Sequence, residues 1–490
     1  MSNTNHTFIR LLSITAACAG VIAICASDSS PLAADFTADY AVFQTMARGW
    51  IDGMLPYRDL FDHKGPVTYL LYMLGFLICP GKTGVYIVEV IFAATTFELL
   101  FRCGRALNIS NRLNYCALAV GLVLFGCLVT GGATVEEWSL PFQLIPLLYG
   151  LKWLLGQHVR IITTAFVSGI CFGIVAMIRI NDNAIVCGLC IGIMATMILH
   201  RQIADCLRCI AAFISGAALA ILPFIIYFGV HHSIDDFLYS ILTFNLHYRS
   251  AWTEPDTLSS LMTKLLKMTP TLVAPVSAYV YDRRHSTAYT ITMTVTAMSA
   301  VTLFSFLPGA GYLHYFIMAM PLGVMAVQLT TGIGKIAKIV TIMLVCGPVG
   351  IYYSDTPVKN YRSFCYTREQ IRARGSNHVL TQAIRAIIPE DERASVYVFG
   401  GNTSAPSLIE SGHLPVGKYF FLQNKLWTID EHISADIVRN FANTRPKWIV
   451  AYLSASHCRP LRPLLNDYEE LSADSMKVCL PPSFHIYRRR

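Results

Sequence analysis

Long apolar segments recur along the first 350 residues of this sequence, and they restrict its fold more than any other feature. Residues 84–101, 161–178 and 207–229 are close to the length that a helix needs to cross a bilayer. The chain of 490 residues is 54% hydrophobic and only 14% charged, whereas soluble domains carry about 25% charged residues. The sequence therefore predicts a polytopic α-helical membrane protein.

The positive-inside rule orders these segments across the membrane. The candidate spans are residues 8–26, 84–101, 113–130, 138–155, 161–178, 183–199, 207–229, 268–281, 288–306, 313–330 and 335–353. If residues 66–79 were also a span, Arg102, Arg105 and Arg112 would lie outside and every later loop would be reversed. We therefore expect about eleven spans, with residues 66–79 as a helix lying along the outer surface. Residues 8–26 fit a signal peptide or an anchor, and the many later spans favour an anchor.

The formal net charge of +8 has a simple explanation in this topology. Most cations lie in short loops between apolar segments, where the positive-inside rule places them. The charge therefore indicates orientation in the membrane, with membrane lipids as partners and no nucleic acid.

The last part of the chain has a different character. Charge rises and apolar runs shorten after residues 1–354, which we expect to form the transmembrane domain. The segments typical of two buried strands and two helices are 395–399, 448–452, 376–388 and 430–443. Residues 355–490 are thus predicted to form a small α/β domain outside the membrane, where Cys458 and Cys479 could pair in an oxidising compartment.

The loop of residues 27–83 is the most polar long interval near the start of the chain, and we expect it outside. Asp39 would lie in the first turn of a helix over residues 37–52, where the positive end of the helix dipole favours a carboxylate. Asp35 is the better candidate for the helix cap. The residues alone leave open which of these two acids would act as a base.

The same loop contains the motif PYRDLFDHKGP, which places several charges beside a membrane. Arg58, Asp62, His63 and Lys64 fall within seven residues. A solvated turn is the simple explanation for such a motif. A site that binds an anion and moves a proton is the alternative that we favour.

Later turns on the same side of the membrane add further candidates. Glu136 and Glu137 lie between two spans, where carboxylates are costly unless they are paired or bound to a cation. Arg179 and His314 lie at the outer ends of other spans. An arginine there can simply extend to lipid headgroups, and the histidine can be structural. We nevertheless expect these groups to converge on one face.

Together these motifs resemble those of the bacterial GT-C class of integral-membrane glycosyltransferases, which includes the protein mannosyltransferases and the aminoarabinose transferase of lipid A. The segments that carry the resemblance are DYAVF, GMLPYRDLFDHKGP, TVEEWSLP, MIRIN and LHYFIMAMP. The resemblance implies an enzyme of the bacterial plasma membrane with its active site outside. It would transfer a sugar from a polyprenyl phosphate, with inversion, to a hydroxyl group of a glycolipid, glycan or protein.

The resemblance also implies roles for the candidate residues. Asp39 matches the early acid of the first outward loop and would act as the base, with Asp62 as a second catalytic acid. The residues expected to bind the donor phosphate are Arg58, Lys64, Arg179 and His314. Glu136 or Glu137 matches the acid of the second outward loop and could hold a divalent cation, Mg²⁺ or Mn²⁺.

Two other classes of membrane protein remain as alternatives. A flippase or transporter of lipid-linked sugars would place its ionisable groups near the middle of the membrane in broken helices, whereas here they lie at outer helix ends. A glycan polymerase or ligase would use a large outward loop rich in Arg and His, and residues 230–267 are the nearest match.

Overall fold

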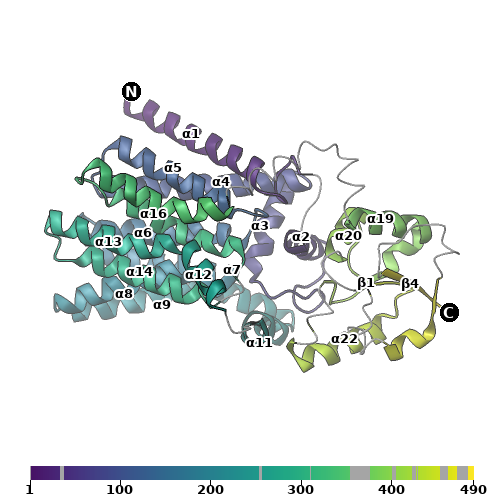
Figure 1. Ribbon diagram of the computed structural model, residues 1–490. Coiled ribbons are helices and arrows are strands. Elements are labelled where there is room, and N and C mark those ends of the chain that lie inside the picture. The colour runs from purple at the N-terminus through teal and green to yellow at the C-terminus, as the bar shows by residue number, and fades with distance from the viewer. Residues whose placement is uncertain are drawn as a thin grey trace. The chain divides into compact units, whose positions relative to one another are not determined.

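The computed structural model describes residues 2–33, 38–252, 257–308, 311–353, 376–399, 404–421, 426, 429–452, 462–471 and 484–490 (Figure 1). The chain divides into two compact units. The helical unit comprises Met1–Pro31, Cys79–Ile226 and Thr253–Tyr361, and the second unit comprises Leu32–Ile78, Tyr227–Trp252 and Arg362–Arg490. The predicted domain boundary near residue 354 stays a prediction.

Each predicted span coincides with a helix or with two consecutive helices. The elements that begin in the helical unit are α1 (Ser2–Cys25), α4 (Lys82–Ala106), α5 (Asn111–Leu128), α6 (Val135–Leu154), α7 (Ile161–Arg179), η1 (Ile180–Asn183), α8 (Ala184–Leu199), α9 (Ile203–Val230), α12 (Leu258–Lys267), α13 (Thr269–His285), α14 (Thr290–Phe306), η3 (Leu313–Ala319), α15 (Met320–Gln328) and α16 (Lys335–Tyr353). Among the described residues, five helical segments are long and apolar enough to cross a membrane. The predicted polytopic α-helical fold is confirmed.

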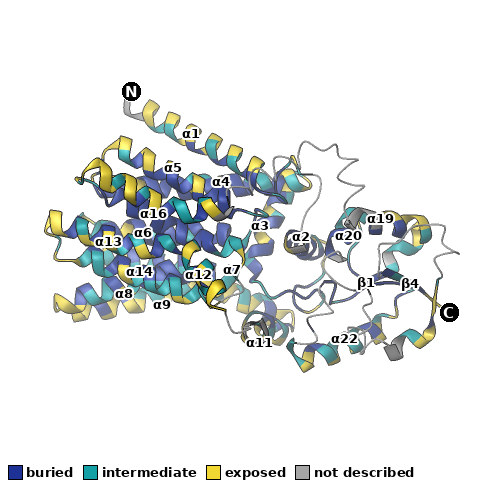
Figure 2. Ribbon diagram, viewed as in Figure 1, coloured by how far each residue is buried: buried dark blue, intermediate teal, exposed yellow. Residues whose placement is uncertain are grey.

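Burial in the helical unit follows the needs of a membrane protein. Apolar side chains from several helices, among them Phe97, Leu144 and Met325, form one core (Figure 2). In contrast, only 6% of the most apolar stretch of α9 is buried. Its exposed Ile214, Leu219 and other aliphatic side chains suit contact with lipid.

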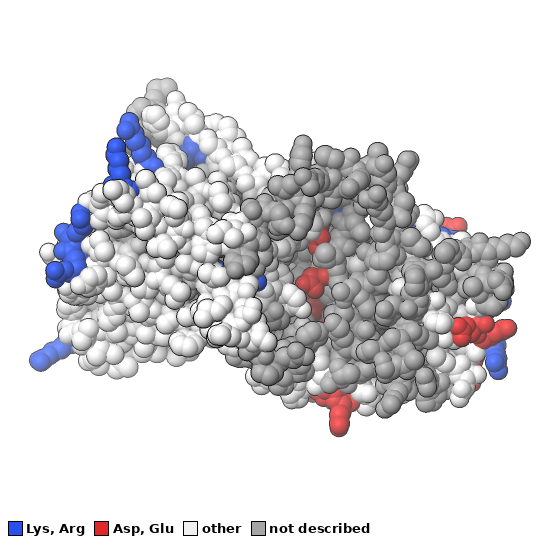
Figure 3. All heavy atoms as spheres, viewed as in Figure 1, with Lys and Arg blue, Asp and Glu red and all other residues white. Residues whose placement is uncertain are grey.

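Lys and Arg side chains of the helical unit gather at one end of it on the face shown in Figure 3. At this end α8 meets α9 and α13 meets α14 (Figure 1). The exposed Arg201 lies between α8 and α9, and the exposed Arg283 and Arg284 lie in the last turn of α13. This one-sided distribution agrees with the orientation that the positive-inside rule predicts.

The first helix is part of the helical unit and is joined to α4 near that end. Both Arg10 and Arg102 contact the carboxylate of Glu98, at 3.0 and 2.8 Å. Cys18 and Ile22 of α1 are fully buried in the core. These contacts support the interpretation of α1 as an anchor.

The second unit combines two earlier segments, Leu32–Ile78 and Tyr227–Trp252, with the C-terminal residues. Its elements are α2 (Ala38–Ile51), α3 (Pro66–Ile78), α10 (Ile234–Leu238), η2 (Tyr239–Thr243), α11 (Phe244–Trp252), α19 (Ser376–Ile387), η4 (Glu390–Ser395), β1 (Val396–Phe399), α20 (Ser404–Ser411), α22 (Glu431–Thr444), β2 (Trp448–Tyr452), η5 (Arg462–Asp467), β3 (Tyr468–Glu470) and β4 (Phe484–Arg489). Asp35, Cys458 and Cys479 lie outside the described residues.

A four-stranded sheet with the order β1-β2-β4-β3 forms the core of the C-terminal residues. Strands β1 and β2 are parallel, with Val396 opposite Trp448, and β4 runs antiparallel to β2. Both predicted strands are β-branched and aromatic segments that fit a buried sheet. Asp430 begins α22 as its cap, because its side chain accepts a hydrogen bond from the His432 backbone N–H. The predicted small α/β fold is confirmed.

Helix α3 occupies the run whose position in the membrane was ambiguous in sequence. It has 13 residues, and at 1.5 Å per residue it is about 20 Å long, whereas the hydrocarbon core is about 30 Å thick. This length supports a helix that lies along the membrane surface.

Candidate functional site

The turn before α6 places two glutamates at the start of a buried helix. Both the backbone N–H and the hydroxyl of Thr134 donate to Glu137 Oε1, at 3.2 and 2.9 Å. Gly132 precedes them with φ at +80°, and a Cβ atom at this position would collide with Ser29 Oγ. The chain therefore needs glycine here to bring the turn against the segment after α1.

Glu89 of α4 meets Glu137 beneath this turn. One Glu89 oxygen accepts a hydrogen bond from the Ala133 backbone N–H at 2.9 Å, and its carboxyl group adjoins that of Glu137. Neither Glu89 Oε2 nor Glu137 Oε2 receives a hydrogen bond within the described part of the chain. Two buried carboxyl groups in this position require a shared proton or a bound cation.

Glu136 points to a different group of charges. Its Oε1 lies 2.5 Å from Arg179 Nη2. Arg179 also binds Asp182, with 2.8 Å between Nε and Oδ1, and Ser139 donates to the other Asp182 oxygen at 3.0 Å. The structure thus joins α6, the end of α7 and η1 through one buried cation between two carboxylates.

Aromatic rings of η3 complete this cluster. The Arg179 guanidinium group lies 4.6 Å from the centre of the Tyr315 ring, a distance that permits a cation–π contact. His314 lies edge-on to the same ring, with 4.9 Å between ring centres. Glu136, Arg179 and His314, which were predicted separately, therefore belong to one neighbourhood.

The metal prediction can be tested against the side chains that are present. Glu136 does not fit a metal ligand, because the Arg179 cation already faces its carboxylate. Glu137 fits better, since the acceptors Glu137 Oε2 and Glu89 Oε2 have no donor among the described residues. Mg²⁺ is commonly bound by one or two carboxylates and keeps several waters.

The second unit contains the other predicted group, the turn of residues 62–64. Asp62 is 1% exposed. It accepts hydrogen bonds from the Tyr69 hydroxyl at 2.8 Å and from the His63 backbone N–H at 2.7 Å. Tyr57 donates to the Lys64 carbonyl oxygen at 2.8 Å. Two tyrosines that sequence reasoning did not single out therefore fix the shape of this turn.

The surroundings of Asp62 raise its pKa above the ordinary value of 3.8. Burial raises the pKa of Asp62, and the negative charge of Asp39 raises it further. Lys64 and the hydrogen bonds from Tyr69 and His63 act in the opposite direction but do not cancel the effect of burial. Asp39 itself is exposed in the first turn of α2, as predicted.

The cations around this turn differ in where they point. Lys64 Nζ lies 2.7 Å from His63 Nε2, and the His63 ring stacks on Tyr248. Arg58 instead binds Asp59, with 2.8 Å between Nε and Oδ1. The structure places Lys64 beside Asp62, whereas Arg58 is exposed and paired with a neighbouring acid.

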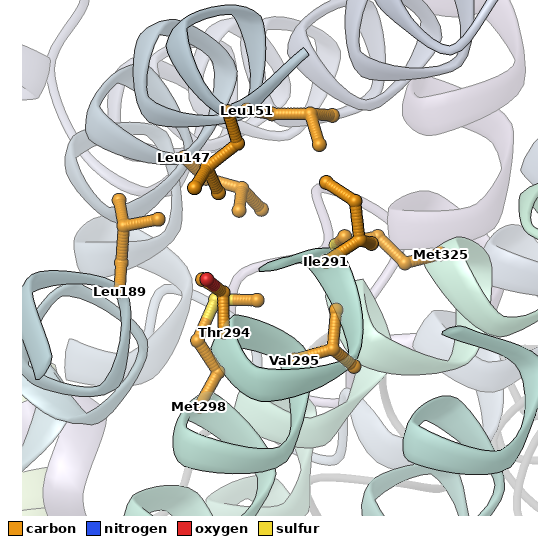
Figure 4. Close-up of a pocket in the computed structure, with 9 residues that line it drawn as sticks. Leu147, Leu151, Leu189, Ile291, Thr294, Val295, Met298 and Met325 are labelled. Carbon is orange, nitrogen blue, oxygen red and sulfur yellow. The ribbon is translucent and has the colours of Figure 1, made fainter. Parts of the chain in front are cut away.

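The cavity of the helical unit and its Cys-x-x-Cys pairs add no charged group to these sites. A small cavity between α6, α8, α14 and α15 is lined by apolar side chains such as Leu147, Leu189 and Met298 (Figure 4). The cysteines of two Cys-x-x-Cys pairs in α8 and α9 are free thiols. No group of three or more His, Cys, Asp or Glu among the described residues is placed to hold a metal ion.

Comparison with known proteins identifies the fold. No protein-family model matches the sequence, and no curated protein matches it. The structure of ArnT from Cupriavidus metallidurans bound to undecaprenyl phosphate is similar over 99% of this chain and 98% of that chain, with a TM-score of 0.56 and 10% identity. The structure of the Archaeoglobus fulgidus oligosaccharyltransferase in complex with Zn and sulfate is similar over 97% of this chain and 74% of that chain, with a TM-score of 0.48 and 11% identity. This chain therefore has the fold of ArnT.

Proposed function

We propose that this chain transfers a sugar from a polyprenyl-phosphate donor to an acceptor hydroxyl group, with inversion, on the outer face of a bacterial plasma membrane. The observation that carries the proposal is the fold shared along nearly the whole chain with ArnT, whose structure contains undecaprenyl phosphate. The acceptor would be a glycolipid, a glycan or a protein.

Asp39 is the base in this proposal. It takes the proton of the acceptor hydroxyl group while that oxygen attacks the anomeric carbon and the bond from this carbon to the phosphate oxygen breaks. Asp39 is exposed, so a hydroxyl group in water can reach it. Asp62 is buried and accepts two hydrogen bonds, and we assign it the role of orienting the turn that carries Lys64.

Departure of the lipid phosphate needs positive charge, because negative charge develops on its oxygen. Lys64 is our first choice for this role, and Arg179 and His314 are further candidates. We expect a smaller contribution from Arg58, since its guanidinium group is paired with Asp59.

A divalent cation would be held by Glu137 together with Glu89, rather than by Glu136. When bound, it would supply positive charge near an anionic substrate. If the two carboxyl groups share a proton instead, transfer will not depend on Mg²⁺ or Mn²⁺. Measuring transfer after chelation and after readdition of each metal distinguishes these two states of the carboxyl pair.

The test of the proposal is sugar transfer by the purified protein with a panel of polyprenyl-phosphate sugars. General-base catalysis contributes about 10²- to 10⁴-fold, so we expect Asp39→Asn to lose at least about 100-fold in rate. Asp52→Asn is the matched control, because Asp52 is an exposed acid just past the other end of α2. Near-complete activity of Asp39→Asn would contradict the assignment of the base.

A further inference from the structure

Helix α11 contacts both neighbours of Asp62 in the second unit. Phe244 is fully buried and lies edge-on to the Phe61 ring, with 5.2 Å between ring centres. One helical turn further on, Tyr248 stacks on the His63 ring, with 5.0 Å between ring centres. Residues four apart lie on the same face of a helix, so α11 presents one aromatic face to the turn that contains Asp62.

Asn245 follows the first of these aromatic residues and binds the backbone of the same turn. Its Nδ2 atom donates to the His63 carbonyl oxygen at 2.9 Å. The same nitrogen donates to the carbonyl oxygens of Ser240 and Ile241, at 3.2 and 3.1 Å. An asparagine amide has two N–H donors, so it can bind the turn and its own helix at the same time. The three carbonyl groups around this nitrogen therefore fix the orientation of the amide.

The carbonyl groups of Ser240 and Ile241 belong to an irregular part of the helix. Residues Tyr239–Thr243 form η2, a π-helix between α10 and α11. Such π-helical turns are rare in proteins and are frequently found at functional sites. A π-helical turn contains more residues than an α-helical turn, so the side chains that follow it point in a different direction. The direction of the Asn245 side chain therefore depends on η2.

Asp430 binds the same helical segment at two positions. Its Oδ2 atom accepts a hydrogen bond from the Tyr239 hydroxyl at 2.6 Å and lies 2.7 Å from His247 Nδ1. Its Oδ1 atom caps α22 by accepting a hydrogen bond from the His432 backbone N–H at 2.9 Å. Although burial raises the pKa of Asp430, the hydrogen bonds from Tyr239 and His247 lower it overall. One ionised carboxylate thus joins the residues on both sides of Asn245 to the start of α22.

We propose that Asn245 is a positioning residue for sugar transfer, because it holds the turn of residues 62–64 in the geometry that presents Lys64. The role of Lys64 rests on the proposed function, whereas the contacts of Asn245 do not. Asp430 acts through Asn245, because it fixes the helical segment from which this side chain extends. An asparagine with a purely structural role would stabilise the second unit without acting through Lys64, and the experiment separates the two roles.

The experiment is a double-mutant cycle that measures sugar transfer by the full-length protein in vesicles. Asn245→Leu removes the amide donor and keeps a side chain of similar size. It should lower the rate of transfer at least about tenfold, since a displacement of about 1 Å in a site can cost about 100-fold. In the Lys64→Gln background, Asn245→Leu should change the remaining rate by less than about twofold, because the group that it positions is absent.

Two further variants complete the comparison. Asn443→Leu is the matched control, because Asn443 is an exposed asparagine of α22, and it should leave the rate unchanged. Asp430→Asn keeps the cap of α22, since asparagine caps helices as well as aspartate does, but it removes the charge that binds His247. This variant should lower the rate in the same way as Asn245→Leu, and it provides the readout if Asn245→Leu does not fold.

Hydrogen exchange of the backbone amides of residues 57–65 gives a readout that does not depend on activity. Asn245→Leu should make this exchange faster, because the turn loses a contact that holds it closed. Equal exchange in the wild type and the variant, or an equal loss of rate with Lys64 present and absent, would overturn the inference and leave the proposed function standing. If the wild type transfers no sugar while exchange still responds to Asn245→Leu, the proposed function fails and the contact between Asn245 and the turn stands.

Discussion

Asp62 shows how the burial of one acid links protonation to folding. Its folded pKa is raised above the ordinary value of 3.8 by burial. The protonated form therefore stabilises the fold, and this contribution is complete below pH 3.8 and is lost as the pH rises through the raised pKa. Above this raised pKa, burial of the ionised side chain destabilises the turn of residues 62–64.

We predict that Asp62→Asn raises the thermal unfolding temperature at neutral pH, because asparagine resembles the protonated acid. The difference from the wild type should shrink as the pH is lowered. Asp59→Asn is the matched control. Although burial raises the pKa of Asp59, hydrogen bonds from Arg58 and from the Leu55 backbone N–H lower it overall, so this variant should be less stable at neutral pH. A lower unfolding temperature of Asp62→Asn at neutral pH would contradict the prediction.

At the scale of elements, the turn between α5 and α6 joins three segments of the helical unit. Gly132 lies against Ser29 of the segment after α1, and the Ala133 backbone N–H donates to Glu89 in α4. The position of Glu137 at the start of α6 therefore depends on a close approach of backbone segments, and not only on the cap at Thr134.

We predict that Gly132→Ala destabilises the protein by more than the roughly 1 kcal/mol that a positive φ costs a non-glycine residue. The added Cβ atom would collide with Ser29 Oγ and lie 2.8 Å from Glu89 Oε1. Gly156→Ala separates the two effects, because Gly156 also has a positive φ, at +68°, but no atom within 4 Å of the added carbon. Equal unfolding temperatures for the two variants, measured in detergent, would refute the close packing.

Some of these elements could be predicted from sequence because local patterns determine them. Apolar runs identified the helices, and a strand-like composition identified β1 and β2. Asp39 was correctly placed in the first turn of α2. The pairing of Glu89 with Glu137 could not be predicted, because it joins residues 48 positions apart on different helices.

At the scale of the whole molecule, the orientation in the membrane is the prediction with the widest consequences. The charge distribution predicts that residues 105 and 285 lie inside the cell and that residue 52 lies outside. In a cysteine-free background, a membrane-impermeant maleimide should label Asp52→Cys in intact cells. It should label Arg105→Cys and His285→Cys only after permeabilisation. Labelling of position 105 or 285 from outside would show that the predicted orientation in the membrane is wrong. The proposal of an outward-facing site would then lose its basis.

The central claim is that a sugar leaves a lipid phosphate in this protein and is joined to a hydroxyl group. Reconstituted vesicles allow sugar transfer and lipid movement to be measured in the same sample, with a labelled polyprenyl-phosphate sugar and a hydroxyl acceptor. The account predicts a glycosylated acceptor of inverted anomeric configuration and one polyprenyl phosphate released for each sugar transferred. Movement of the labelled lipid between leaflets with no sugar transferred to any acceptor would contradict it.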